Sequence, residues 1–535
     1  MDKMEIVDVL RRNLLRNNFV EQFISYNIDS RKHSRLNKKL QSEVLIEMNP
    51  AYTTYILYSI VCRAKLKNNH RLVGYRPTKP SSIKNFFTFH LFANLLIDNG
   101  SYRPFRIMWS MGVNKFIQPW YIKKHKNKAM KFYKQILNLD KKGLIALRIN
   151  EIEIGDIFYD WHLRKRLLAT ANLNRKLFKK DLIEFVCTFY WWYEYFTTRK
   201  IDSVFISHSC SDLALPARIG LSFKSEVIFA SYGRMYRLSN DRKFSDLEFI
   251  DYNPGSKQQF GYVIDLDRSK KLLTETIQGR YLIDAHTVGS GYSGHLSGNI
   301  VSKSTQINVL VACACFSDPP HAYGDTIFPD AKEWLSFIGE FSESSDYKFY
   351  AKAHPNFWDS DKIHYDNFLK EFPNIIKIPS GYSNLELFKQ GINVVLTIHG
   401  TIAFEAAYQG ILVVNASRNS PHMNYNFSLT PKSIEDYYKI LKDLPQLIGT
   451  WKINKHEIEH FFDIHHVRKN FHPLFGNKLP DFYRYIGGWS EQFLNPKVFD
   501  YWLNVQPKGE RLGTENRIIN FLENKDYMLS SIDTK

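Results

Sequence analysis

From residue 143 onward, short apolar runs alternate with longer segments in which apolar residues recur at helical spacing. Because strands that alternate with helices build parallel sheets covered by helices on both faces, this pattern predicts a doubly wound α/β fold. The runs expected to form its strands are, in chain order, IDSVFISHS, SEVIFAS, INVLVACACF, YKFYAKA, NIIKIP, NVVLTI and ILVVNA.

Two changes in this pattern indicate how the chain divides into domains. A chain of 535 residues is too long for a single core. Its first part is aromatic-rich with few alternating runs and is predicted to be mainly helical, whereas a glycine- and serine-rich stretch, GSGYSGHLSGNIVSKS, later interrupts the alternation. We expect a helical basic region, a first Rossmann-like domain, a linker, a second Rossmann-like domain and C-terminal helices, at residues 1–140, 141–290, 291–304, 305–430 and 431–535.

The net positive charge of the chain indicates which kinds of molecule it binds. A formal net charge of +18 implies attraction to something anionic, such as nucleic acid, lipid headgroups or a phosphorylated substrate. Lysines are dense in YIKKHKNKAMKFYKQ at residues 121–135, where aromatic residues lie between them. This segment is either a solvated helix face or a surface that lies on an anionic membrane. No nucleic-acid-binding signature accompanies it, so we expect no nucleic-acid partner.

Cysteine usage and the apolar runs indicate the compartment. The five cysteines are odd in number and lie inside apolar runs, which favours reduced thiols in cytoplasm. The N-terminal sequence MDKMEIVDVLRRNLLRNN carries charges where a signal peptide needs an apolar core, and no run reaches the roughly 18 apolar residues of a membrane span. We therefore expect a cytoplasmic protein that is peripheral to the inner membrane.

The stretch LTIHGTIAFEAAYQGILVVNA predicts a strand, a tight turn, a helix and a second strand. Ligands of open parallel sheets collect at the carboxyl ends of strands, which is where His399, Gly400 and Thr401 lie. Gly400 allows close backbone approach, Thr401 can cap the helix, and the amides there favour an anion such as a nucleotide phosphate. Glu405, one helical turn later, can accept hydrogen bonds from a ribose. Taken alone, the same residues also suit an ordinary structural turn.

A second group of polar residues precedes this turn, in FYAKAHPNFWD. Pro355 can begin a turn directly after a strand, which leaves His354 at the carboxyl edge of the same sheet. Lys352 and His354 can both donate to phosphate oxygens, and a histidine can protonate a leaving phosphate. The preceding apolar run ends shortly before Asp318, so this carboxylate is expected at the same edge.

These segments resemble a known group of enzymes. VACACFSDPPHAYGDTIFPDAKEWLSFI, KAHPNFWD and HGTIAFEAAYQGILVV are similar to the C-terminal domain of bacterial surface-polysaccharide glycosyltransferases, a group similar to the capsule Kdo transferases and bacterial sialyltransferases. Upstream, IEIGDIFYDWHLR and VFISHSCSDLALPARIGL resemble segments of their N-terminal domain. The resemblance covers roughly residues 145 to 430. It implies the GT-B fold, in which two Rossmann-like domains face a cleft.

The resemblance also implies roles for particular residues. His354 would contact the donor phosphate, Thr401 stands where the family has Ser or Thr, and Glu405 would hold the ribose. The implied reaction transfers a sugar, such as Kdo from a CMP donor, to a polysaccharide or lipid-linked glycan. It needs no cofactor and no metal, because basic side chains neutralise the leaving phosphate. His399 replaces a small polar residue of many relatives, which leaves the nucleobase open.

Glycosyl transfer also needs a carboxylate, usually from the acceptor domain, and GDIFYD offers Asp156 and Asp160. Their spacing places both on one helix face, where one pKa can rise. Arg164, four residues after Asp160, can pair with it, so Asp156 is the first candidate for the base and its alternative role is a helix N-cap. His208 and Asp212 follow a predicted strand and are candidates for contact with the acceptor.

Three alternatives remain open. HEIEH at residues 456–460 matches a zinc-protease pattern, although Asp463 stands where the longer form of that pattern needs glycine. CDP-polyol phosphotransferases also have a His-Pro pair, but they usually carry paired serines where this chain has His399-Gly400-Thr401. A nucleotide-sugar epimerase would need a serine- and glycine-rich phosphate turn and more acidic catalytic residues.

Overall fold

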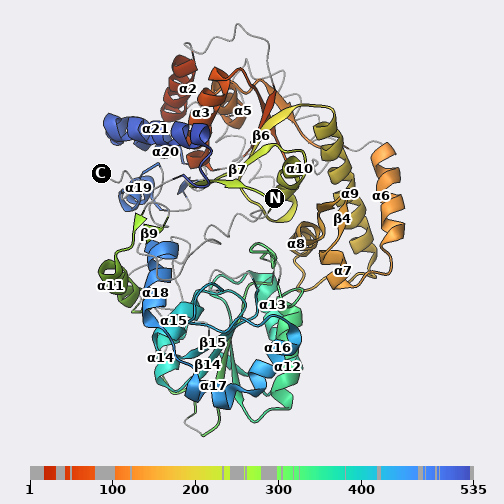
Figure 1. Ribbon diagram of the computed structural model, residues 1–535, viewed down its shortest axis with the longest axis vertical. Coiled ribbons are helices and arrows are strands. Elements are labelled where there is room, and N and C mark those ends of the chain that lie inside the picture. Colours follow the sequence, from red (N-terminus) through yellow and green to blue (C-terminus); the bar gives the residue numbers. More distant parts are fainter. Residues whose placement is uncertain are drawn as a thin grey trace.

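The computed structural model of the chain consists of two α/β lobes, one above the other in Figure 1. Each lobe is built around one mainly parallel sheet. The structure describes residues 17–31, 42–48, 51–78, 103–120, 123–231, 234–240, 258–259, 262–278, 298–302, 305–316, 318–324, 326–379, 381–418, 423–467, 474–475, 478–488, 491–492 and 495–529.

The sheet of the first lobe has six strands in the order β3-β2-β1-β6-β7-β8. All neighbouring strands pair in parallel except β8, which runs antiparallel to β7. The strands are β1 (Glu43–Glu47), β2 (Arg71–Tyr75), β3 (Lys115–Ile117), β6 (Ile201–Ile206), β7 (Glu226–Ser231) and β8 (Arg234–Leu238). Counted within this lobe, the parallel part has the Rossmann order 3-2-1-4-5.

Helices bury both faces of this sheet. In β1, Val44 and Ile46 pack into one hydrophobic core and Leu45 packs into the other, because side chains alternate between the faces of a strand. The first core includes residues of α2 (Asn18–Arg31), α3 (Tyr52–Lys67) and α5 (Arg103–Ser110). The second is covered by α6 (Lys123–Gln135), α7 (Lys141–Ile145), α8 (Gly155–Arg166), α9 (Lys176–Thr197), the 3-10 helix η1 (Ser211–Ala214) and α10 (Leu215–Ser222), with the small hairpin β4 (Arg148–Ile149) and β5 (Ile152–Glu153) between α7 and α8.

The sheet of the second lobe has five parallel strands in the order β13-β12-β11-β14-β15. They are β11 (Asn308–Ala312), β12 (Lys348–Lys352), β13 (Ile376–Ile378), β14 (Val394–Thr397) and β15 (Leu412–Asn415). Counted within this lobe, their order is again 3-2-1-4-5. The predicted α/β class with two Rossmann-like domains is therefore confirmed.

Two cores again flank the second sheet. Phe349 and Ala351 of β12 face the core that contains Trp334 and Phe368, whereas Tyr350 faces the core that contains Phe404. The helices on the first side are α12 (Ala331–Glu343), α13 (Asp359–Glu371), α16 (Ile434–Lys442) and α17 (Leu444–Thr450). Those on the second side are α11 (Leu266–Ile277), α14 (Asn384–Lys389), α15 (Ile402–Tyr408), α18 (Lys455–Phe462) and the π-helical turn η3 (Asp463–Val467).

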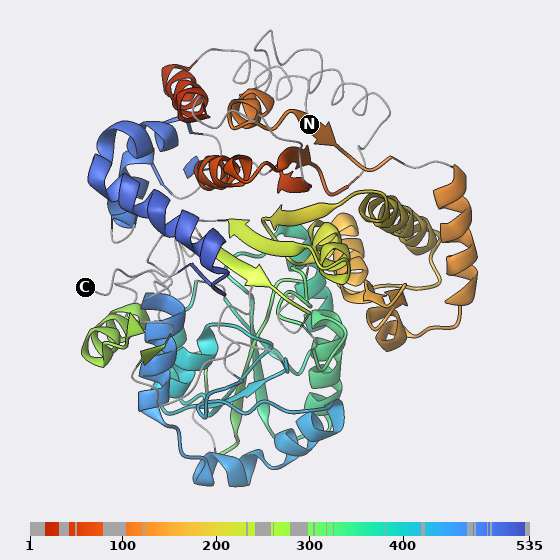
Figure 2. The same cartoon turned by 45° about the horizontal axis from the view of Figure 1, so that its top comes forward.

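After the second lobe, the chain returns to the first. Both views place the C-terminal helices beside α2 and α3 (Figures 1 and 2). The ring of Phe499 lies 4.2 Å from that of Phe23 and 4.8 Å from that of Tyr52, centroid to centroid. The returning elements are α19 (Leu479–Ile486), α20 (Lys497–Asp500), the π-helical turn η6 (Tyr501–Val505) and α21 (Lys508–Asn524).

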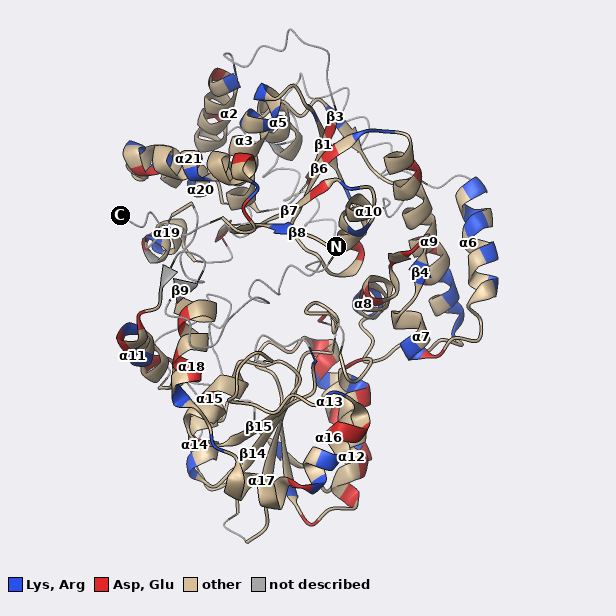
Figure 3. Cartoon of the chain, in the orientation of Figure 1, with Lys and Arg blue, Asp and Glu red and all other residues tan. Residues whose placement is uncertain are grey.

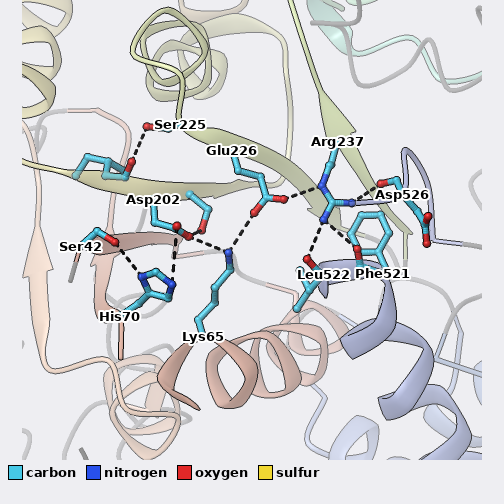
Figure 4. Close-up of polar contacts among 12 residues, drawn as sticks. Ser42, Lys65, His70, Asp202, Ser225, Glu226, Arg237, Phe521, Leu522 and Asp526 are labelled. Carbon is cyan, nitrogen blue, oxygen red and sulfur yellow. Dashed lines mark hydrogen bonds and ion pairs between the residues drawn. The ribbon is translucent and has the colours of Figure 1, made fainter. Parts of the chain in front are cut away.

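A network of charged side chains fastens this returning segment to the first sheet (Figure 4). Lys65 Nζ lies 2.9 Å from Asp202 Oδ2 and 3.1 Å from Glu226 Oε2. Arg237 Nε donates to Glu226 Oε1 at 2.7 Å, and its Nη2 donates to the carbonyl oxygens of Phe521 and Leu522 at 2.9 and 3.2 Å. The guanidinium thus satisfies carbonyls at the end of α21, which have no partner within the helix.

The structure corrects three of the expected domain boundaries. The expectation that residues 1–140 are mainly helical is wrong for 43–117, which contain β1, β2 and β3. These strands are at most five residues long and nearly all buried, so no polar alternation marks them. Helix α11 was assigned to the first domain, but Leu273 packs in the core of the second. The expected C-terminal helices divide between both domains, and most of the linker at 291–304 lies outside the described residues.

None of the described helices is long and apolar enough to cross a membrane.

Candidate functional site

A pocket opens at the carboxyl edge of the second sheet, where β11, β12 and β14 end. Three separate segments of the chain meet there because the carboxyl ends of parallel strands share one edge. The residues that the sequence predicted to bind a donor all line it: Asp318, Lys352, His354, Pro355, His399, Gly400, Thr401 and Glu405.

His354 has a defined tautomer. The backbone N–H of Asn356 donates to His354 Nδ1 at 3.2 Å, and Cys315 Sγ lies 3.4 Å from the same atom. Because a backbone N–H can only donate, Nδ1 must accept, and the neutral ring carries its proton on Nε2. Burial lowers the pKa of His354, although Asp318 and Asp361 act in the opposite direction. At neutral pH His354 therefore offers one N–H donor.

Lys352 and Glu405 bring opposite charges into the pocket. Lys352, the last residue of β12, is buried, and its Nζ donates to Asn384 Oδ1. Burial lowers the pKa of Lys352 to about 8, and the carboxylate of Glu405 partly offsets this effect. Glu405 is itself buried on α15. An ammonium group with so little water around it binds a phosphate oxygen more strongly than a surface lysine does.

The turn at residues 399–401 differs from the expectation in one respect. The hydroxyl of Thr401 makes no cap hydrogen bond, and Thr401 is exposed. Thr397 Oγ1 accepts from the N–H of Gly400 at 3.2 Å instead, so this threonine organises the turn. A Cβ atom on Gly400 would lie 2.9 Å from that hydroxyl, which explains the glycine. Since α15 has only seven residues, its N-terminus is a weak anion site.

His399 has fewer polar neighbours than His354, the other histidine that lines the pocket. Its Nδ1 atom is buried and has no hydrogen-bond partner among the described residues. Its ring meets that of Tyr323 edge-on, with 4.9 Å between centroids. Burial lowers the pKa of His399 to about 4, and His354 adds to the shift. His399 is therefore neutral at physiological pH.

Sequence reasoning missed the polar neighbours that orient these residues. Asn356 and Asn384 line the pocket and bind His354 and Lys352. Cys315 lies beside Asp318 and His354, and burial raises the pKa of its thiol well above the usual range. Cys315 could have been found from the end of the apolar run INVLVACACF, but the two asparagines carry no signal in the sequence.

The two carboxylates expected to supply the base are already paired. Asp156 Oδ2 lies 2.6 Å from Arg218 Nη2, and both side chains are mostly buried. Asp160 Oδ1 lies 2.6 Å from Nδ1 of His321, which belongs to the second domain. Neither aspartate lines the pocket, and Arg164 was wrongly expected to pair with Asp160. Asp156 and Asp160 are therefore each held in an ion pair.

Helix α8, which carries both aspartates, connects the two domains. Besides the pair with His321, the hydroxyl of Tyr159 donates to Asp330 Oδ2 at 2.5 Å. Asp330 lines the pocket and caps α12, where it accepts from the N–H of Glu333. Burial opposes protonation of His321, but the carboxylate of Asp160 outweighs it and raises the pKa of His321.

His208 and Asp212 lie on the other side of this interface. They follow β6, and the segment that carries Asp212 packs against α8. Burial lowers the pKa of His208 to about 4, and Arg164 adds to the shift. Burial raises the pKa of Asp212. The charge of Arg164 also acts on Asp212 and on Asp318, which lines the pocket of the second domain.

The zinc-protease pattern does not form a metal site. On α18, the side chain of His456 is 81% exposed, and its Nδ1 lies 3.3 Å from Glu459 Oε2. His460 is buried. Glu457, the expected general base, accepts hydrogen bonds from Asn426. Within the described part of the chain, no three His, Cys, Asp or Glu side chains are grouped as a metal ion would require.

Comparison with known proteins gives only distant likenesses. No protein-family model matches the sequence, and no curated protein is significantly similar to it. Among solved structures, UDP-GlcNAc 2-epimerase from Neisseria meningitidis bound to UDP-GlcNAc is 12% identical, over 79% of this chain and 98% of that one, with a TM-score of 0.23.

Two further solved structures are similar at the same level. A glycosyltransferase from Rickettsia africae ESF-5 is 11% identical, over 88% of this chain and 100% of that one, with a TM-score of 0.24. The wall teichoic acid polymerase TagF is 10% identical, over 86% of this chain and 93% of that one, with a TM-score of 0.21. At such values these likenesses carry no information about the chemistry of this chain.

Proposed function

We propose that the protein is a glycosyltransferase that uses a nucleotide-sugar donor, for example CMP-activated Kdo or a related acidic sugar, and acts on a surface polysaccharide or glycolipid at an anionic membrane. The observation that carries the proposal is the pocket, in which Lys352 and His354 at the end of β12 come together with Glu405 of α15. Resemblance of these segments to users of CMP-sugars favours the cytidine donor over others.

Each of these side chains matches one part of such a donor. Lys352 and the Nε2–H of His354 are donors for phosphate oxygens, and the Glu405 carboxylate can accept from two ribose hydroxyls. When the bond from the anomeric carbon to the phosphate oxygen breaks, negative charge grows on the phosphate. The two donors would bind it more strongly at that moment, which lowers the barrier to transfer.

The first test is a thermal-shift panel of the protein with CMP, CDP, UDP and GDP. A ligand that binds only the folded state raises the melting temperature, so selective stabilisation by CMP is expected. His354→Ala and Glu405→Ala should each weaken CMP binding by about tenfold or more, since each removes a hydrogen bond in which one group, the phosphate or the Glu405 carboxylate, is charged. His456→Ala is the matched control, because His456 is exposed on α18.

The outcomes separate the parts of the proposal. Stabilisation by UDP or GDP alone would keep a nucleotide-sugar enzyme and replace the donor. Unchanged CMP affinity in both folded variants would overturn the assignment of the pocket, and stabilisation by none of the nucleotides would overturn the proposed function.

The membrane part of the proposal rests on helices α6 and α9, which pack antiparallel. Lys124 Nζ lies 3.1 Å from Glu194 Oε2, and Lys179 Nζ lies 4.9 Å from the centroid of the Tyr133 ring. This register brings the end of α6 and the loop after it beside the start of α9. Figure 3 shows how densely Lys and Arg cover α6.

Exposed apolar and basic side chains lie together where the end of α6 and the loop after it meet the start of α9. Leu137 is 57% exposed and Leu177 49% exposed, in a part of the surface where lysines predominate. A surface that offers leucines between lysines suits the headgroup region of an anionic bilayer, since lipid phosphates attract the lysines and the acyl boundary accepts the leucines. The exposed lysines of this surface are Lys131, Lys134, Lys142, Lys176, Lys179 and Lys180.

Sedimentation with vesicles tests this surface. The protein should sediment with phosphatidylglycerol-containing vesicles at low salt, but not with vesicles of phosphatidylcholine alone. Lys131→Glu with Lys134→Glu should abolish binding, and Leu137→Ser with Leu177→Ser should weaken it at every salt concentration. The control is Lys389→Glu with Lys508→Glu, which changes charge equally on other helices. Equal binding by all variants would exclude this surface as the docking site.

A further inference from the structure

A chain of hydrogen bonds runs from the end of β1 to the residues after β6. These strands are neighbours, with Ile46 level with Phe205, so Glu47 comes to lie beside Ser207. The backbone N–H of Ser207 donates to Glu47 Oε2 at 2.5 Å, and its hydroxyl donates to Glu47 Oε1 at 2.9 Å. The same Ser207 Oγ lies 2.9 Å from Nδ1 of His208.

The proton count along this chain fixes the tautomer of His208. A serine hydroxyl has one hydrogen, and when Glu47 is ionised that hydrogen is on the bond to Glu47. Ser207 Oγ must then accept from His208, so Nδ1 carries the ring proton. The lone pair of the neutral ring is consequently on Nε2, the nitrogen that can take a proton from a reacting group.

Protonation of Glu47 reverses the donor and acceptor roles in these hydrogen bonds. A protonated Glu47 donates to Ser207 Oγ, whose own hydrogen then points to His208 Nδ1 and moves the ring proton to Nε2. Burial raises the pKa of Glu47 to about 7, and the charge of Asp212 adds to the effect, whereas the two hydrogen bonds from Ser207 lower it. Among the described residues, Tyr58 and Tyr75 also interact electrostatically with Glu47, and the charge of Arg164 acts on His208.

This chain lies at the side of the first domain that meets the donor pocket. His208 lies shortly before η1, which packs against α8. Helix α8 in turn contacts Asp330 of the pocket through Tyr159 and His321 of the second domain through Asp160. Arg164 acts electrostatically both on His208 and on Asp318 of the pocket. The segment of His208 and the pocket are thus linked through the same helix, α8, and through the charge of Arg164.

We propose that His208 is the general base of the transfer reaction and that Ser207 and Glu47 are positioning residues that hold its proton on Nδ1. The inference rests on the proposed function. In the step, the acceptor oxygen forms a bond to the anomeric carbon and gives its proton to His208 Nε2. The bond from that carbon to the phosphate oxygen breaks, and its electron pair leaves with the phosphate, which accepts a hydrogen bond from His354 Nε2–H.

Substitutions along the chain test the proposal with CMP binding measured in parallel. His208→Gln should leave the CMP dissociation constant unchanged and reduce donor turnover, with acceptor or with water, by about 100-fold or more. Ser207→Ala should also lower turnover, while Ser207→Thr, which keeps the hydroxyl, should restore it. A purely structural role of Ser207 would not separate alanine from threonine. His456→Gln is the control.

Glu47→Gln tests directly whether the ionised Glu47 sets the tautomer of His208. The side-chain amide oxygen of the introduced glutamine must accept from the N–H of Ser207, so the amide NH₂ group donates to Ser207 Oγ. The hydrogen bonds from residue 47 to His208 then keep the direction that they have when Glu47 is protonated. Wild-type turnover should rise with pH around 7 as Glu47 ionises, whereas the variant should remain at the low level throughout.

Nitrogen-15 NMR of histidine-labelled protein provides a readout that does not depend on activity. The His208 signals, assigned by their loss in His208→Gln, should show protonated Nδ1 in the wild type at pH 8 and protonated Nε2 in Glu47→Gln. Unchanged turnover of His208→Gln, or a loss confined to Asp212→Asn, would overturn the proposal. Failure of the wild type to bind any nucleotide would instead overturn the proposed function, so the two failures are distinguishable.

Discussion

At the scale of single residues, two histidines of the interface differ in tautomer because their neighbours differ. The N–H of Asn356 makes His354 Nδ1 an acceptor, whereas Ser207 makes His208 Nδ1 a donor when Glu47 is ionised. One ring therefore presents an N–H and the other a lone pair on its second nitrogen. The proposed transfer step uses one group of each kind: a base for the acceptor hydroxyl and a hydrogen-bond donor for the leaving phosphate.

The buried lysine of the pocket predicts a pH dependence of donor binding. Because the pKa of Lys352 is about 8, the free protein loses this positive charge as pH rises through that value. CMP affinity should therefore fall between about pH 7 and pH 9, although a bound phosphate delays the loss by favouring the charged form.

Calorimetric titration of CMP over this pH range provides the check. Lys352→Arg should remove the dependence, since a guanidinium stays charged, and Lys389→Arg is the control on the surface. Affinity that is constant with pH in the wild type would show that Lys352 does not bind the nucleotide phosphate.

At the scale of elements, α8 joins the two domains through residues that lie one helical turn apart. Asp156 pairs with Arg218 of α10 inside the first domain, while Tyr159 and Asp160 reach Asp330 and His321 of the second. The i, i+4 spacing of the aspartates, which suggested a catalytic pair, instead gives the helix one anchor in each domain.

Asp156→Asn should consequently affect stability more than turnover. The substitution removes the Asp156 carboxylate from the Arg218 guanidinium, which is 4% exposed. We expect the free energy of unfolding to fall by about 3 kcal/mol or more, with CMP binding and turnover retained in the folded fraction. Urea denaturation followed by fluorescence measures this change.

A double-mutant cycle with Arg218→Met provides the control. When both partners are removed, no uncompensated charge remains, so the double variant should be no less stable than Asp156→Asn. Loss of turnover without loss of stability would return Asp156 to the candidates for the base.

The sequence predicted the position of residues near strand ends of one domain, but it did not predict contacts between segments far apart in the chain. Lys352 and His354 lie at the end of β12 and Glu405 lies on the helix after β14, so their common sheet edge could be inferred from the regular alternation of strands and helices. Glu47 lies 160 residues from Ser207, on a buried strand too short to show alternation. The partners of Asp156 and Asp160 come from α10 and from the other domain, and no local pattern reports them.

At the scale of the whole molecule, the chain crosses from the first domain to the second and back. The last described residues complete the first domain: Leu529 N donates to the carbonyl of Met235, and Arg237 N donates to that of Tyr527, so the C-terminal end extends the edge of the first sheet. Arg237 adds its guanidinium contacts to α21 and to Glu226 (Figure 4). The stability of the first domain should therefore depend on residues that follow the second.

Arg237→Ala tests this dependence. It removes the cation that satisfies the end of α21 and leaves Glu226 with Lys65 as its remaining cation in Figure 4, so we expect a loss of about 2 kcal/mol or more in unfolding free energy. Arg237→Lys should recover only part of it, because an ammonium group cannot bind the carboxylate and the carbonyls in the planar, forked geometry of a guanidinium.

Limited proteolysis followed by intact mass measurement locates the effect. In Arg237→Ala, cleavage between the second domain and α21 should accelerate, while the second domain should retain its CMP-induced protection, because Arg237 contacts neither the pocket nor its helices. Arg484→Ala, whose guanidinium is 79% exposed on α19, should change neither rate. If both arginine variants were cleaved alike, the returning segment would owe its attachment to the ring contacts of Phe499 with Phe23 and Tyr52, and the charged network would be dispensable.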